Sequence, residues 1–106
     1  MINDPKDGEA ELDPIAEAIL RELAATKRPA ISAERVCRAI QDERAKPGDG
    51  PLAWRKYLRA VKQQAIFLAR AGRIEIVRRG KPVDPNNFKG VWRMRLPRPD
   101  RVLRAD

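Results

Sequence analysis

The sequence predicts a domain that is mainly α with a small antiparallel β-hairpin. Three segments between residues 13 and 71 carry apolar side chains at helical spacing, and two segments between residues 73 and 96 alternate apolar and polar residues. Helical spacing buries one stripe of a helix, whereas alternation buries one face of a strand. With 106 residues, 42% of them apolar, the chain can form one modest core. We therefore expect a single domain of three helices followed by two strands.

The two N-terminal helices have clear start signals. Asp13 precedes Pro14, so its carboxylate can accept hydrogen bonds from the first turn, and proline at the first helical position loses no backbone bond. This helix is expected to end near Thr26. Ser32 can cap a second helix, which fades near Arg44. The short piece before Ser32 is expected to be extended.

The third and longest helix is expected from about residue 52 to residue 71. One narrow arc of its surface carries apolar side chains, namely Trp54, Leu58, Val61, Ala65 and Leu68. Gly72 follows at the position where a left-handed residue can end a helix. Ile66 and Phe67 lie outside the arc. We expect them to contact the hairpin, although an exposed apolar pair could also be a partner site.

Two alternating segments, 73–79 and 90–96, are expected to pair as a hairpin. Ile74 and Ile76 would share the buried face of the first strand. In the second strand the expected buried face carries Trp92, Met94 and Leu96, and the opposite face carries Arg93 and Arg95. Residues 80–89 are rich in turn-forming residues and should form the tip of the hairpin. We call the whole hairpin the wing and residues 80–89 the wing tip.

The order helix, short extended piece, helix, long helix and hairpin is that of a winged helix, made of three helices plus a wing. In that fold the third helix and the wing usually face the ligand. The winged-helix domain would span residues 13–97. Residues 1–12 are polar and acidic and are expected to form a flexible N-terminal tail. Residues 98–106 are expected to form a flexible basic C-terminal tail.

The positive charge lies mostly in the C-terminal half of the chain. Residues 51–106 carry fifteen Lys or Arg against four Asp or Glu, whereas residues 1–50 carry eight against eleven. The basic half contains the expected third helix and the wing. A basic surface on those two elements indicates a polyanion as partner, with nucleic acid as the first candidate.

The candidate nucleic-acid-binding residues lie on the third helix and the wing. Arg55, Arg59 and Lys62 form one helical stripe, and no acidic residue occurs between residues 52 and 71. Arginine binds phosphates and guanine edges, and glutamine can pair with adenine. The full candidate set is Arg55, Lys56, Arg59, Lys62, Gln63, Arg78, Arg79, Lys81 and Lys89.

The same side chains have structural interpretations. A cationic helix face can simply be solvated, and charges beside a wing can protect a strand edge from aggregation. For Arg55 we favour stacking on an aromatic ring or an ion pair with Glu17 or Glu22. Phe88 at the wing tip is either a core residue or an exposed wedge, and Cys37 is expected to be a small core filler.

Several short motifs between residues 15 and 96 are those of a known family. They are Trp54-Arg55, the pattern of Val61-Lys62 with Ala65 and Leu68, Gly72-Arg73-Ile74-Glu75-Ile76, Gly80, and Gly90-Val91-Trp92-Arg93-Met94-Arg95. In these motifs the chain resembles a small bacterial family known as domain of unknown function 3253, which is regarded as winged-helix-like. The resemblance implies that fold but no established activity.

Composition narrows the function classes. A single cysteine and no histidine argue against an internal disulfide, a zinc site and Cys/His catalysis. No catalytic constellation is present, so we expect neither an enzyme nor a cofactor nor a metal. Charges interrupt every apolar run, and the acidic start is unlike a secretory leader, so we expect a cytoplasmic protein without a membrane span.

The leading hypothesis is a protein that binds duplex DNA through the third helix and the wing, as a transcriptional regulator would. RNA binding fits the same charge distribution. The alternative is a protein-protein interaction module of winged-helix fold without nucleic-acid binding, in which the Ile66 and Phe67 pair would form a homodimer contact.

Overall fold

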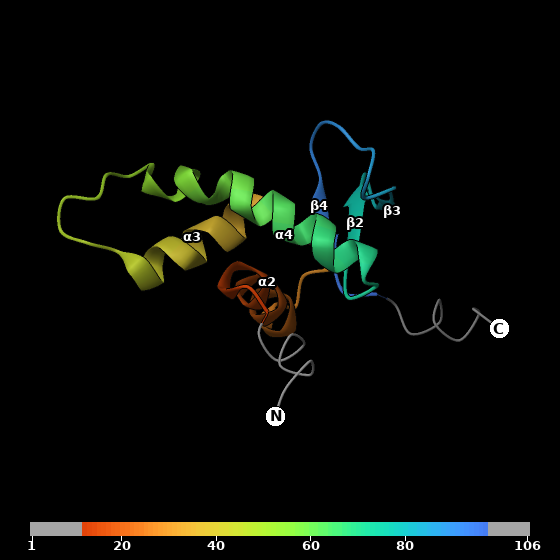
Figure 1. The fold of residues 1–106 in the computed structure, drawn as a ribbon, viewed down its shortest axis with the longest axis horizontal. Helices are drawn as coiled ribbons and strands as arrows, with labels where there is room; N and C mark the ends of the chain where they lie inside the picture. The colour runs from red at the N-terminus through yellow and green to blue at the C-terminus, as the bar shows by residue number, and fades with distance from the viewer. Residues whose placement is uncertain (1–11, 98–106) are drawn as a thin grey trace, which may run out of the picture.

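The computed structural model describes residues 12–97, and in that range it has three α-helices and a small antiparallel sheet (Figure 1). About half of the described residues are helical. The architecture is therefore mixed α/β rather than mainly α. Apart from Leu12, the two expected tails lie outside the described residues. Leu12 is half-buried and packs against the core, so it belongs with the domain.

The first two helices begin at the expected caps. Helix α2 (Pro14–Ala25) starts after Asp13, whose carboxylate accepts a hydrogen bond of 2.7 Å from the backbone N–H of Ile15. Helix α3 (Ala33–Arg44) starts after Ser32, whose hydroxyl accepts one of 3.1 Å from the backbone N–H of Arg35. Each cap satisfies an amide that has no partner inside its helix.

The expected third helix consists of two parts. A 3₁₀ helix, η1 (Ala53–Tyr57), leads into α4 (Leu58–Arg70). Because a 3₁₀ helix turns roughly 120° per residue rather than about 100°, Leu58 does not follow Trp54 onto the core face. Trp54 is buried, but Leu58 is 39% exposed, so the expected burial of Leu58 was wrong.

Helix α4 ends at the expected glycine. Gly72 has a φ of +76°, and the backbone N–H of Arg73 donates to the carbonyl of Leu68 at 2.9 Å. This is the hydrogen bond of a Schellman motif, which satisfies carbonyls at a helix end. Among the helices of residues 12–97, none has the length and apolarity to cross a membrane.

The sheet has four strands within the described range, not the two that the alternation predicted. They are β1 (Ile31–Ser32), β2 (Glu75–Arg78), β3 (Lys81–Pro82) and β4 (Arg93–Arg95), in the antiparallel order β1-β4-β2-β3. The expected hairpin strands are the central pair, with Ile76 opposite Met94, and both are shorter than expected. The two outer strands have only two residues each, too few for a periodic signal.

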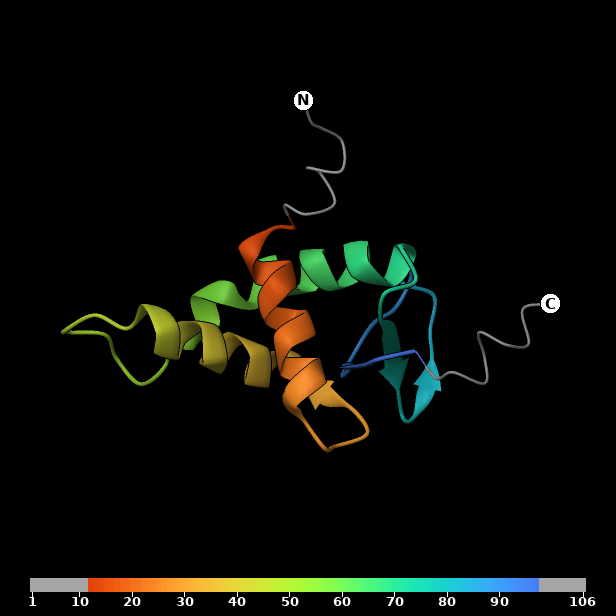
Figure 2. The same cartoon turned by 90° about the horizontal axis from the view of Figure 1, so that it is seen from below.

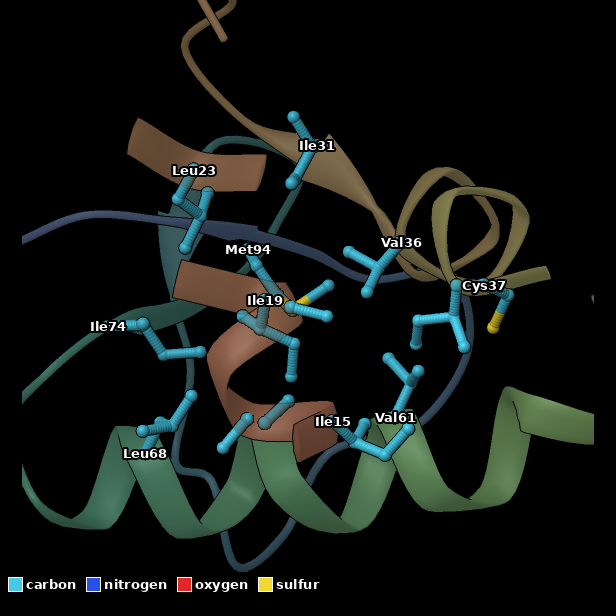
Figure 3. Packing of buried hydrophobic residues seen from close by; sticks show 14 of the residues in the cluster. Ile15, Ile19, Leu23, Ile31, Val36, Cys37, Val61, Leu68, Ile74 and Met94 are labelled. Atoms are coloured by element: carbon cyan, nitrogen blue, oxygen red, sulfur yellow. The ribbon is translucent and has the colours of Figure 1, made fainter. Parts of the chain in front are cut away.

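The helices pack on one face of the sheet. Helix α3 and the η1–α4 segment run side by side, and α2 crosses them (Figure 2). Side chains from all three α-helices and the sheet converge on one core, including Ile19, Leu68, Ile74 and Met94 (Figure 3). Trp92 is only half-buried and Leu96 is 45% exposed, so the expected burial of Leu96 was wrong. Leu96 comes directly after the last residue of β4 and pairs with no residue of the other described strands.

Candidate nucleic-acid interface

The five candidates on η1 and α4 are all exposed. They are Arg55, Lys56, Arg59, Lys62 and Gln63. The segment 52–71 contains no carboxylate, and the ion pairs found among residues 12–97 join Glu22, Glu34, Glu43 and Glu75 to other arginines. The four helix cations therefore have no ion-pair partner in the described part of the chain. They are available to an external anion.

Arg55 makes the contact with an aromatic ring that its structural interpretation predicted, but not the ion pair with Glu22. Its guanidinium lies 5.9 Å from the ring centroid of Trp54, whereas that of Arg38 lies closer, at 4.9 Å. Glu22 pairs with Arg35 at 3.6 Å instead of with Arg55. Because Arg55 is exposed and adjoins Trp54 in sequence, this contact leaves the guanidinium open to solvent.

The wing folds back against α4. The ammonium of Lys62 lies 5.1 Å from the ring centroid of Phe88, and Arg70 donates a hydrogen bond to the side-chain carbonyl of Asn86. Phe88 is half-buried and makes a T-shaped contact with Trp92, with 5.5 Å between ring centroids. Phe88 therefore packs against the domain and is not an exposed wedge. Its neighbour Lys89 is exposed.

Arg78 connects two segments of the wing through contacts of its guanidinium. This half-buried side chain donates from Nε to the carbonyl of Val91 at 3.1 Å. Its guanidinium also lies over Gly90, where a Cβ would come within 2.7 Å of Nη2. Arg78 thus holds together two parts of the β-structure, in contrast to the open helix cations.

Arg79 and Lys81 lie away from the helix. Arg79 and Gly80 form a two-residue turn between β2 and β3, and Arg79 has a φ of +53°. Both cations are exposed, and Figure 2 shows this turn at the end of the sheet away from α4. The contact between Lys62 and Phe88 therefore brings the segment that carries Lys89 to α4, whereas Arg79 and Lys81 belong to a second basic region. Arg93 and Arg95 also belong to that region, and they were not among the candidate residues, although their alternation with Met94 places them on one sheet face.

Cys37 has the properties of a core residue. It is fully buried, and burial, together with the nearby carboxylate of Glu34, raises the pKa of its thiol to about 11. A thiol that stays protonated at neutral pH is a poor nucleophile. Cys37 therefore contributes packing and not chemistry.

Comparison with known proteins places the whole domain in one family. The family model described as protein of unknown function (DUF3253) matches residues 13–97. No curated protein matches the sequence. The match covers all the helices and strands described above. The chain therefore belongs to the DUF3253 family.

Proposed function

We propose that this protein binds duplex nucleic acid, DNA in the first place, through the exposed face of η1 and α4. The observation that supports this most directly is that residues 52–71 contain no Asp or Glu, while Arg55, Arg59 and Lys62 of this segment are exposed and form no ion pair among residues 12–97. A surface helix without a ligand would gain stability from pairs of opposite charge. Unbalanced cations favour phosphate binding instead.

The element order adds support. Helix, short strand, helix, long helix and hairpin is the order of a winged helix, so we interpret the fold as one. The major groove is about 12 Å wide and admits an α-helix. With α4 in the groove, Gln63 would face base edges, and the contact between Lys62 and Phe88 would place Lys89 beside the same duplex. A cytoplasmic location is part of this proposal.

The proposed interface is narrower than the candidate set. Arg78 is occupied in bracing the wing, and the turn with Arg79 and Lys81 lies at the far end of the sheet. Five cations remain, Arg55, Lys56, Arg59, Lys62 and Lys89. Each neutralised phosphate contributes about 0.9 to the slope of log affinity against log salt, so five contacts give a slope of about −4.5.

Fluorescence anisotropy with a labelled random duplex tests this proposal. Replacing Arg59 and Lys62 with glutamine should change the slope to about −2.7 and weaken binding roughly 60-fold at 0.1 M salt. The matched control replaces Lys27 and Arg28, two exposed cations of the α2–β1 loop, and should leave the slope nearly unchanged. Because Arg59 and Lys62 form no ion pair within residues 12–97, the melting temperature should fall by no more than about 5 °C.

Two results would reject duplex binding by this face. One is a dissociation constant weaker than about 100 μM for the unaltered protein at low salt. The other is an equal loss of affinity in the control variant, which would indicate nonspecific attraction to the whole basic surface. Competition among duplex DNA, single strands and structured RNA at one salt concentration then ranks the nucleic acids.

A protein-protein interaction module is the second candidate function. Phe67 of α4 is 51% exposed, whereas Ile66 packs against the core, so only Phe67 of the expected pair can contact a partner directly. Sedimentation without nucleic acid tests this function. A tight dimer that a Phe67→Ser substitution converts to monomer would favour it, and a monomer at all accessible concentrations would count against a homodimer.

A further inference from the structure

A hollow of about 240 Å³ lies on the face of the sheet that is turned away from the helices. Ile76 and Met94 point into the core, so their neighbours Val77, Arg93 and Arg95 point to the opposite face. The hollow is also lined by the turn residue Arg79 and by Val91 and Trp92, which precede β4. The hollow is separate from the exposed face of α4.

The lining has one sign of charge. Of the nine described residues that line the hollow, three are arginines and none is acidic. By contrast, the hollow beside Trp54 combines Arg38 and Lys46 with two aspartates. Single-sign lining concentrates the field in a cleft and favours an anion of opposite charge.

Two of these arginines form no ion pair with another described residue, and the third has unused hydrogen-bonding capacity. Arg79 and Arg93 are exposed and form no ion pair within residues 12–97. Arg95 pairs through Nε with Glu75 at 2.8 Å, but its Nη2 is buried without an acceptor in the structure. A buried guanidinium N–H without an acceptor is unfavourable, and an anionic oxygen would satisfy it.

The remaining lining is apolar and includes a flat ring. Trp92 is half-buried: it packs against the core cluster and makes a T-shaped contact with Phe88, and it also lines the hollow together with Val77, which is 3% exposed. Val91 is 79% exposed at the rim. An indole ring with aliphatic neighbours offers a stacking surface to another planar ring, and every nucleobase has one.

The backbone of Arg79 is a further unusual feature. Two-residue hairpin turns with positive φ at both central positions favour Asn-Gly or Asp-Gly, yet here the first position is arginine, with a φ of +53°. A non-glycine residue in this region is strained and is often found at ligand sites. This turn places Arg79 among the residues that line the hollow.

We propose that this hollow binds one nucleotide, with the base against Trp92 and the phosphate among Arg79, Arg93 and Arg95. The hollow of about 240 Å³ is smaller than the roughly 300–1,000 Å³ of pockets that enclose a ligand of nucleotide size, so part of the bound nucleotide would stay in contact with solvent. Two sources share this chemistry, a free mononucleotide and the unpaired terminal nucleotide of a strand. The proposal does not depend on duplex binding by α4.

NMR titration of the ¹⁵N-labelled protein with AMP tests the proposal, because the two tryptophans give separate indole signals. AMP should shift the indole signal of Trp92 and the amides of Arg79 and Arg93, while the signal of Trp54 serves as the internal control. Adenosine and inorganic phosphate should each bind far more weakly than AMP. Absence of a Trp92 shift at millimolar AMP, or an equal shift with phosphate alone, would overturn the assignment.

Matched substitutions separate this proposal from duplex binding. Arg93→Gln should weaken AMP binding about tenfold, since it removes one charge-assisted hydrogen bond, and should leave blunt-duplex affinity nearly unchanged. Arg59→Gln removes the same charge from α4 and should have the opposite pattern. Unchanged AMP affinity in Arg93→Gln would refute the hollow as the site, whatever happens to duplex binding.

Duplexes with and without a single-stranded overhang distinguish the two sources. Tighter binding of the overhang duplex, with the gain abolished by Arg93→Gln, supports a terminal nucleotide as the occupant. Equal affinity for both duplexes, together with AMP binding at Trp92, supports a free mononucleotide. If overhang duplexes gain affinity and Arg93→Gln retains that gain, the hollow is not where the strand end binds.

Discussion

Replacing Gly90 with alanine should destabilise the domain more than the same substitution at Gly72. Both glycines have positive φ, +81° and +76°, so alanine is strained at either position. The surroundings differ. A Cβ at Gly72 would meet nothing within 4 Å, whereas at Gly90 it would lie 2.7 Å from Nη2 and 3.2 Å from Cζ of Arg78. The guanidinium must move to make room.

The structure gives the size of each effect. Left-handed backbone costs alanine about 1 kcal/mol, and this part is common to both positions. At Gly90 the displaced Arg78 also loses its 3.1 Å hydrogen bond to the carbonyl of Val91. That bond is worth about 1 kcal/mol. We therefore expect a loss in the free energy of unfolding of about 1 kcal/mol for Gly72→Ala and about 2 kcal/mol for Gly90→Ala.

Urea and thermal unfolding, followed by circular dichroism, measure this difference. For a domain below 100 residues, 1 kcal/mol corresponds to a shift of about 4–8 °C in melting temperature. A double-mutant cycle isolates the contact with the guanidinium. In an Arg78→Ala background Gly90→Ala should cost only the backbone strain, which gives a coupling of about 1 kcal/mol between the two positions.

Equal losses at Gly72 and Gly90, combined with zero coupling to Arg78, would refute the reasoning. Arg78 would then be a surface cation like those of α4, and it would return to the set of phosphate-binding candidates. Unfolded-state effects cannot mimic the expected result, because the change from glycine to alanine restricts the unfolded chain equally at both positions.

Three further predictions concern single side chains. Cys37 should resist Ellman's reagent at pH 8 until the protein unfolds, and rapid labelling of the native protein would contradict this. Because folding raises the pKa of its thiol from 9.0 to about 11, the contribution of Cys37 to the free energy of unfolding is complete below pH 9 and declines as pH rises toward 11. Ser32→Ala should cost about 1 kcal/mol in chemical unfolding through the lost cap of α3, whereas Ser32→Thr should cost much less. Arg79→Asn should raise the melting temperature, by relief of up to about 1 kcal/mol of strain, while it weakens AMP binding in titration, and a drop in melting temperature would show that Arg79 is not strained.

Local signals explain which parts of the fold were predictable. The caps at Asp13 and Ser32 and the left-handed Gly72 depend on neighbours within a few residues, so each appears directly in the sequence. The two central strands were found because their alternation is also local. Leu58 was misplaced because nothing in its neighbourhood distinguishes a 3₁₀ turn from an α-helical one, although this choice decides which side chains face the core.

Nonlocal contacts explain what the sequence could not provide about the candidate site. Exposure of the α4 cations followed from the apolar arc, and the structure has them exposed as expected. The role of Arg78 depends on a carbonyl thirteen residues away, and the packing of Phe88 depends on Lys62 of another element. The two basic regions could be separated only once the β2–β3 turn was located, and β3 is too short to be detected by its pattern.

The pairing of β1 with β4 has a consequence for how the domain is assembled during synthesis. Ile31 of β1 lies opposite Met94 of β4, so β1 leaves the ribosome long before the strand with which it pairs. Contacts among α2, α3 and α4 can form first, because they join segments closer in the chain. β4 can join β1 and β2 only after residues 93–95 have been synthesised, and its pairing completes the burial of Met94. A nascent chain halted before residue 93 would therefore lack β4 and would expose, to chaperones and proteases, the apolar side chains that β4 covers in the complete domain.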